Sequence, residues 1–91
     1  MKEGDIRKLL KTRVEAWGGE VRAVKWLGRS NAPDVLVLFP TGRHVFIETK
    51  RPNKKATEAQ AREHERMYRA GCNVQVITNE QELDAWLPPR S

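Results

Sequence analysis

Residues 33–50 read PDVLVLFPTGRHVFIETK, and the central part of the predicted fold follows from this stretch. Two apolar runs, 33–39 and 45–50, flank a turn signal at residues 40–43, a pattern that predicts an antiparallel β-hairpin. Side chains alternate between the two faces of a strand, so Glu48 and Lys50 point to the same side. Closing the hairpin places Asp34 within about one residue of Glu48 across the strand pair.

These three charged residues have the chemistry of a metal-dependent hydrolytic site. The carboxylate oxygens of Asp34 and Glu48 suit a hard divalent cation such as Mg²⁺. The ammonium group of Lys50 can steady an attacking hydroxide or a phosphate oxygen. The alternative interpretation is structural: Asp34 caps a turn, Glu48 pairs with a neighbouring base, and Lys50 is a surface lysine at the end of a strand.

The rest of the chain predicts a single domain over residues 1–91, without a linker or an internal repeat. Hydrophobic periodicity and capping signals predict five further elements. They are a helix capped by Asp5 and ended by Gly18-Gly19, a strand over 20–26, a helix from Thr57 to Gly71, a strand over 74–77 and a short helix from Asn79. The complete order is αβββαβα. We predict that helices cover both faces of the strand within 33–39, because that run is apolar on both faces.

The spacing of the charged residues resembles the PD-(D/E)xK nuclease superfamily, and the chain is similar to its small stand-alone VRR-NUC branch, the virus-type replication-repair nucleases. The resemblance covers nearly all 91 residues. It is carried by Glu3, Gly18-Gly19, Pro33-Asp34, Glu48-Thr49-Lys50 with Pro52, Gln60, the link Gly71-Cys72-Asn73 and the strand at 74–77. It implies an α/β fold with an αβββαβ core, a central mixed sheet flanked by helices, and a short C-terminal helix. Where this family commonly has a glycine, the chain has Asn31, which tolerates a left-handed backbone.

The resemblance also implies roles for site residues. Asp34 and Glu48 would hold Mg²⁺, which Mn²⁺ can replace, with Glu3 aiding and the backbone carbonyl of Thr49 a further ligand. Lys50 would be the catalytic lysine. Gln60 matches a position beside that lysine, where an amide can orient it or the phosphate. Two alternatives stay open: Glu3 as a solvated residue of a frayed terminus, and Gln60 as the fourth residue of the capping box begun by Thr57.

The chain is basic, with 17 Lys and Arg against 12 Asp and Glu and a net charge of +5. That excess is consistent with a polyanionic partner. Five basic residues near the site in sequence are candidates for phosphate contacts: Lys25, Arg29, Arg51, Lys54 and Lys55. Each one taken alone is equally well explained as a solvated charge. Trp26 could stack on an unpaired base or fill a subunit interface.

These features predict a metal-dependent nuclease that hydrolyses phosphodiester bonds. The resemblance implies a homodimer that acts on branched DNA, such as a four-way junction, in replication or repair. The alternative is a non-catalytic, structure-selective DNA-binding module. An RNA substrate stays open, because nothing in the sequence reads a 2′-hydroxyl.

The surroundings in which the chain works can also be predicted. No apolar run reaches the roughly 18–20 residues of a membrane span, and no secretory signal is visible. A single cysteine, Cys72, permits no internal disulfide and fits a reducing compartment. We therefore expect the cytoplasm and no membrane partner, and the resemblance implies that the cell is bacterial or phage-infected.

Overall fold

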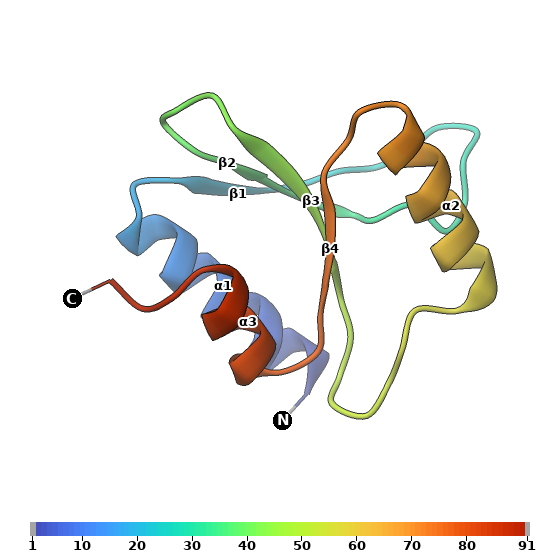
Figure 1. Cartoon of the computed structure of the whole chain (residues 1–91). Helices are drawn as coiled ribbons and strands as arrows, with labels where there is room; N and C mark the ends of the chain where they lie inside the picture. The colour runs from blue at the N-terminus through green and yellow to red at the C-terminus, as the bar shows by residue number, and fades with distance from the viewer. Residues whose placement is uncertain (1, 91) are drawn as a thin grey trace.

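The computed structural model describes residues 2–90 and contains three helices and four strands (Figure 1). The elements are α1 (Glu3–Ala16), β1 (Glu20–Ala23), β2 (Val35–Leu38), β3 (His44–Thr49), α2 (Glu58–Arg69), β4 (Val74–Ile77) and α3 (Glu80–Trp86). This order confirms the predicted αβββαβα sequence of elements. Within residues 2–90, no helix is long and apolar enough to cross a membrane.

The four strands form one mixed sheet in the order β1-β2-β3-β4. The first three strands are antiparallel neighbours, whereas β3 and β4 are parallel, so α2 serves as the crossover that a parallel pair requires. In the β2–β3 hairpin, Val35 lies opposite Ile47. The same register continued by one residue sets Asp34 opposite Glu48, as the sequence predicts.

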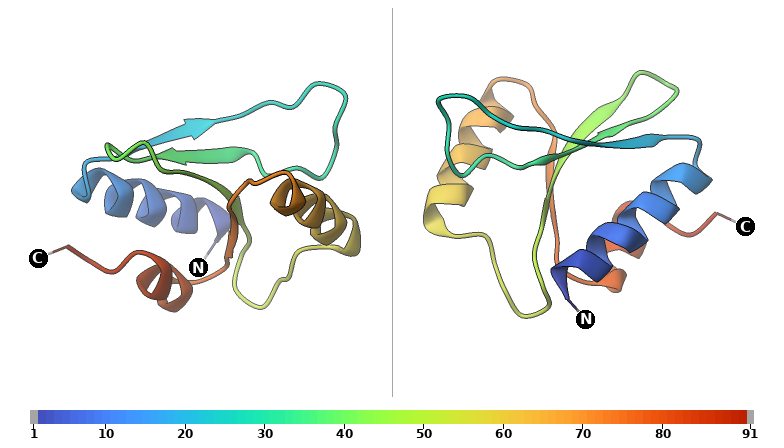
Figure 2. Two further views of the ribbon diagram at one scale, coloured as in Figure 1. Left: turned by 45° about the horizontal axis from the view of Figure 1, so that its top comes forward. Right: turned by 180° about the vertical axis from the view of Figure 1, so that it is seen from behind.

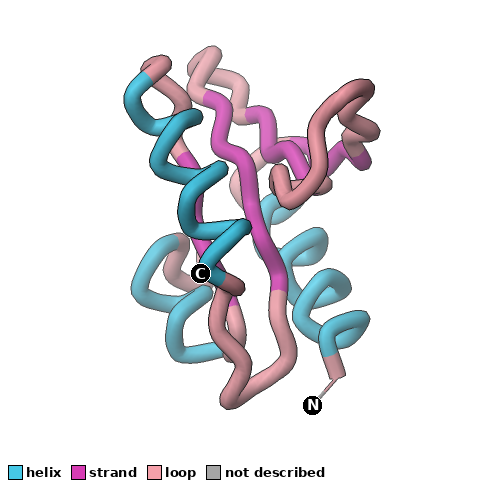
Figure 3. Tube along the Cα trace, turned by 90° about the vertical axis from the view of Figure 1, so that its right-hand side faces the viewer, coloured by secondary structure: helices cyan, strands magenta, loops and turns pink. Residues whose placement is uncertain are grey.

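Helices lie on both sides of the sheet, with α1 and α3 together and α2 apart from them (Figure 2). In the tube view, α2 is the helix nearest the viewer and lies in front of the strands (Figure 3). The main core lies under α1, where Ile6, Leu10 and Val14 follow helical spacing and are fully buried. They pack with side chains of the sheet and α3, namely Val35, Val37, Val45, Ile47, Ile77 and Leu83. Alternate residues of β3 therefore face α1, and Glu48 faces the side of α2.

Three predicted details are wrong. β1 ends at Ala23 rather than at 26, although Val24 N–H still donates to the Asp34 carbonyl at 2.9 Å. Helix α1 begins at Glu3, so Asp5 lies inside its first turn and accepts a hydrogen bond from Lys2 N–H at 2.9 Å. The outer face of β2 is only half-buried, because α2 packs against β4 rather than over β2.

Three backbone positions confirm the turn chemistry that the sequence predicts. Helix α1 ends at Ala16, and Gly18, just beyond it, has a φ of +79°. Gly19 lies so close to the sheet that a Cβ there would stand 2.7 Å from the Leu38 carbonyl oxygen. Asn31 has a φ of 67°, the left-handed conformation expected where the family commonly has glycine. The loop that delivers Asp34 to the site therefore keeps its turn.

Candidate active site

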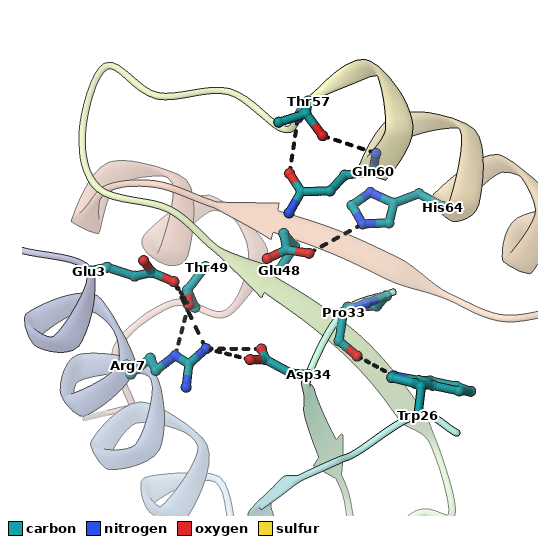
Figure 4. Close-up of polar contacts among 10 residues, drawn as sticks. All are labelled: Glu3, Arg7, Trp26, Pro33, Asp34, Glu48, Thr49, Thr57, Gln60 and His64. Carbon is teal, nitrogen blue, oxygen red and sulfur yellow. Dashed lines mark hydrogen bonds and ion pairs between the residues drawn. The ribbon is translucent and has the colours of Figure 1, made fainter. Parts of the chain in front are cut away.

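Arg7 on α1 connects three of the predicted site residues (Figure 4). Its Nη2 donates to both carboxylate oxygens of Asp34, at 2.9 and 3.0 Å, and its Nε donates to Thr49 Oγ1 at 3.1 Å. The Thr49 hydroxyl donates in turn to Glu3 Oε1 at 3.2 Å. Glu3, Asp34 and Thr49 thus converge from α1, the start of β2 and the end of β3. The resemblance implies a role for the Thr49 carbonyl, whereas this network uses the Thr49 hydroxyl.

Glu48 is a buried carboxyl group, with 7% of the residue exposed. Burial raises the pKa of Glu48 to about 6, from an ordinary value of 4.5. The positive charge of Lys50 opposes that rise, the carboxylates of Asp34 and Glu3 add to it, and Arg7 opposes it again. The charges of Glu3, Asp34, Glu48, Lys50 and Arg7 therefore act on one another, and the acids in this cluster outnumber the bases.

His64 on α2 lies against Glu48, a position that no pattern in the sequence predicts. Its Nε2 is 3.6 Å from Glu48 Oε1, and the two side chains are only 12% and 9% exposed. Among the residues that the structure describes, this buried Nε2 has no hydrogen-bond partner. Burial lowers the pKa of His64, Glu63 opposes the change and Lys50 adds to it, so the imidazole is favoured in its neutral form.

Gln60 takes part in the capping box of α2 and also reaches toward the site. Thr57 N–H donates to Gln60 Oε1 at 2.9 Å, and Gln60 N–H donates to Thr57 Oγ1 at 3.1 Å. The side-chain nitrogen of Gln60 points toward Glu48 in Figure 4. The two interpretations left open by the sequence are therefore compatible without any change of rotamer, because the oxygen caps the helix and the nitrogen stays available.

A cleft of about 750 Å³ opens beside this cluster, between the start of α1 and the connection from β3 to α2. Positive side chains dominate its walls. The lining residues are Lys2, Glu3, Gly4, Lys50, Arg51, Lys54, Lys55 and Thr57. Three of the five predicted phosphate-contacting residues are thus in the cleft wall with Lys50, and Lys2 joins them from outside the predicted set.

The other two predicted phosphate contacts lie elsewhere. Lys25 is exposed in the β1–β2 loop. The Arg29 guanidinium, in the same loop, pairs with the buried carboxylate of Glu63 on α2 at 3.1 Å, and Arg66 pairs with that carboxylate from within the helix, also at 3.1 Å. Arg29 therefore fastens the loop to α2, while half of its side chain remains exposed.

Trp26 holds the backbone that leads into Asp34. Its indole N–H donates to the Pro33 carbonyl at 2.7 Å, and its ring packs against Phe46 with centroids 5.4 Å apart. The half-buried indole thus has an internal partner for its polar atom, which neither interpretation of the sequence included.

The donor set fits a hard divalent cation. Within residues 2–90, no three acidic, histidine or cysteine side chains are grouped closely enough to hold a metal ion in this conformation, and both oxygens of Asp34 accept hydrogen bonds from Arg7. The three carboxylates of Glu3, Asp34 and Glu48 suit such a cation for two reasons. They repel one another, and carboxylate oxygens are the ligands that Mg²⁺ and Mn²⁺ prefer.

Three residues near this site were not predicted from the sequence: Arg7, His64 and Lys2. Weak signals for two of them exist, since Arg7 is four residues after Glu3 and His64 is four residues after Gln60, which puts each on the helical face of a suspected site residue. Lys2 carries no such signal.

Comparison with known proteins gives a consistent result. The family model described as the VRR-NUC domain matches residues 6–81, a range that includes all the predicted site residues except Glu3. A protein of Acyrthosiphon pisum secondary endosymbiont phage 1, named "Putative nuclease p44", is 36% identical over 88 residues, covering 97% of this chain and 94% of its own. A solved structure titled VRR_NUC domain is 44% identical, with a TM-score of 0.85, covering 93% of this chain and 92% of that one.

Proposed function

We propose that this chain hydrolyses phosphodiester bonds of DNA with a divalent metal ion, Mg²⁺ or Mn²⁺. The chain belongs to the VRR-NUC domain family and is therefore a nuclease. One observation supports the proposal above the others: Asp34, Glu48 and Lys50 lie together at one end of the β2–β3 hairpin, beside a cleft lined with positive side chains. A fold without this function would have little reason to bury Glu48 among other carboxylates.

In this proposal Asp34 and Glu48 hold the cation, and Glu3 and Thr49 complete the site from the α1 side. When bound, the ion lowers the pKa of water and offsets the charge that builds on the phosphate. At Asp34 the cation would share the carboxylate with Arg7 or displace it, and the guanidinium would stay nearby as a donor to Glu3, Thr49 or the phosphate.

Lys50, directly after β3, supplies the positive charge that lowers the pKa of Glu48 most. Its ammonium group orients the attacking water for in-line displacement at phosphorus. Gln60, whose side-chain nitrogen points toward Glu48, keeps the lysine or a phosphate oxygen in place. No covalent intermediate with the protein is needed, so no side chain has to act as a nucleophile.

The cleft beside Lys50 is the proposed path of the nucleic acid backbone. Arg51, Lys54 and Lys55 contact phosphates there, which gives affinity and salt dependence without base specificity. Lys25 lies on the β1–β2 loop and contacts the backbone beyond the cleft, and Arg29 contributes the exposed half of its side chain.

The finer parts of the proposal concern substrate and assembly. We propose branched DNA, such as a four-way junction, as the preferred substrate and a two-fold homodimer as the working form, since two symmetric sites suit such a junction. The support is the family resemblance together with the net charge of +5. The phage relative supports the cytoplasm of a bacterial or phage-infected cell as the place of action.

The test is cleavage of labelled four-way junction, flap, duplex and single-stranded DNA, and of single-stranded RNA, with Mg²⁺, Mn²⁺ or EDTA. Asp34→Asn and Glu48→Gln should reduce cleavage to the level seen in EDTA while DNA affinity stays within a few-fold. Glu20→Gln is the matched control, because Glu20 is an exposed acid that pairs with Arg22 on β1. Full activity in either site variant would remove the proposed metal site.

The second candidate function, a non-catalytic DNA-binding module, makes a different prediction in the same assay. The Arg7 pair with Asp34 is the observation in its favour, because the guanidinium already compensates the charge of a carboxylate that a cation would need. Binding of the junction without cleavage, unchanged by Asp34→Asn or by the metal, would establish the module and overturn the nuclease.

A further inference from the structure

We propose that His64 is a positioning residue of the nuclease site, whose Nε2–H donates a hydrogen bond to Glu48 Oε1 and fixes the carboxylate for the cation. The inference rests on the proposed function, in which Glu48 is a metal ligand. His64 itself touches neither metal nor substrate in this role.

The geometry that points to this role is the approach of two buried polar groups. His64 Nε2 and Glu48 Oε1 are 3.6 Å apart, slightly beyond a hydrogen bond, and both side chains are almost completely enclosed. Nε2 has no hydrogen-bond partner among residues 2–90, although leaving a buried ring nitrogen unpaired destabilises the folded state. A movement of a few tenths of an ångström would satisfy that nitrogen with the carboxylate it already faces.

The place of His64 in the fold also suits the role. One turn separates it from Gln60 on α2, and both side chains lie over Glu48 (Figure 4). The neighbouring Glu63 fastens this part of α2 to the β1–β2 loop through Arg29, so the helix is held in position over the hairpin. Metal-binding carboxylates are commonly hydrogen-bonded by such outer partners, which orient one oxygen and leave the other for the ion.

Two other interpretations of His64 are distinguishable from positioning. If His64 only fills space between α2 and the sheet, its side chain needs the right volume but no hydrogen-bond donor. A direct metal ligand would need the lone pair of Nε2, so an amide donor could not replace it. A positioning residue needs a donor at the Nε2 position, which the side-chain amide of glutamine can supply.

The primary experiment measures Mn²⁺ binding to the DNA-free protein by electron paramagnetic resonance, which requires no cleavage. His64→Phe, which keeps the volume and removes the donor, should weaken Mn²⁺ binding by about 10-fold, the lower end of the effect of outer partners on metal affinity. His64→Gln should restore most of that affinity. His44→Phe is the matched control, since His44 is exposed at the start of β3, and its affinity should be that of the wild type.

A double-mutant cycle assigns the effect to Glu48. In a Glu48→Gln background, His64→Phe should cause no further loss of Mn²⁺ affinity. Equal losses with and without the Glu48 carboxylate, or wild-type affinity in His64→Phe, would overturn the proposal. Loss of binding in His64→Gln as large as in His64→Phe would also overturn it and favour a direct ligand.

A metal-free measurement separates this inference from the proposed function. Nitrogen-15 correlation spectra of the protein in EDTA should report the Nε2–H tautomer of His64, with a ring proton resonance that moves in Glu48→Gln. An Nδ1–H tautomer would overturn the inference even if the wild type cleaves DNA. Failure of the wild type to cleave any substrate would overturn the proposed function, whatever the tautomer.

Discussion

Glu48 is a carboxyl group that is buried and also lies close to other acids. A carboxyl group with so little exposure would ordinarily be paired by a close base, yet its neighbours include two further acids, Asp34 and Glu3. Lys50 compensates only part of that charge, and the pKa remains raised to about 6. In the metal-free protein the ionised form of Glu48 therefore costs stability.

That cost predicts a pH-dependent effect of Glu48→Gln on the stability of the metal-free protein. The pKa of Glu48 is higher in the folded chain than in the unfolded one, so the protonated carboxyl group favours the folded state. This contribution to the free energy of unfolding is fully present below pH 4.5 and is lost as the pH rises through about 6. The difference between the two pKa values corresponds to at most about 2 kcal/mol in the free energy of unfolding. Denaturant unfolding in EDTA should show the variant gaining up to this amount over the wild type between pH 4 and pH 8. A constant difference between the two proteins would contradict the raised pKa.

Arg7 is the second residue whose environment makes a prediction, because in the proposed site it would compete with the cation for Asp34. Arg7→Gln removes the bidentate pair and one positive charge, and we expect Mn²⁺ to bind more tightly. Both partners are about half exposed, so the gain should be up to about 1 kcal/mol, or roughly fivefold. Calorimetric titration measures it, with Arg22→Gln on β1 as a control of equal charge. Weaker binding would mean that Arg7 supports the acids instead of competing for them.

Among the helices and strands, α2 determines how closely the site is held together. Its face toward the sheet carries Gln60 and His64, and its buried Glu63 receives Arg29 from the β1–β2 loop. The loop that ends in Asp34 is thus fixed at two points, by this ion pair and by the hydrogen bond from Trp26 to Pro33. The helix and the loop position the two acids of the hairpin relative to each other.

Glu63→Gln should therefore loosen the loop and destabilise the fold. The carboxylate is 5% exposed and serves two guanidinium groups, which are half exposed, so we expect a loss of about 1–2 kcal/mol. Glu65→Gln is the matched control on the same helix, because its pair with Arg69 is exposed and should contribute less than about 0.5 kcal/mol. Urea unfolding compares them. Equal stability of the two variants would show that Glu63 does not anchor the loop.

Across the molecule, the distribution of charge separates a negative cluster from a positive cleft. Acids gather where β2, β3 and α1 meet, and the cations of the β3–α2 connection line the cleft next to them. This arrangement agrees with the proposed binding of a polyanion next to a cation. The fold thus meets both requirements of the proposed reaction within 91 residues.

The salt dependence of DNA binding tests the cleft. Replacing Lys54 and Lys55 by alanine should flatten the plot of log affinity against log salt by about 0.9 for each phosphate that the variant no longer neutralises. The control replaces Lys8 and Lys11 by alanine, which removes the same charge from a separate depression between α1 and β1. Fluorescence anisotropy between about 50 and 200 mM salt, a range in which such slopes are resolved, measures the slope of each variant. The same slope in the two double variants would mean that the cleft does not carry the backbone.

The hairpin, the order of elements and the opposition of Asp34 to Glu48 follow from the amino-acid sequence alone. These features depend on periods of two or 3.6 residues and on turn and capping residues, which act over a few positions of the chain. Three further features emerge only when the chain is folded: Arg7 spans Asp34 and Thr49, His64 lies against Glu48, and α2 leaves β2 half-covered. Those contacts join residues far apart in sequence, and they follow from the way helices pack on the sheet, which no local pattern specifies.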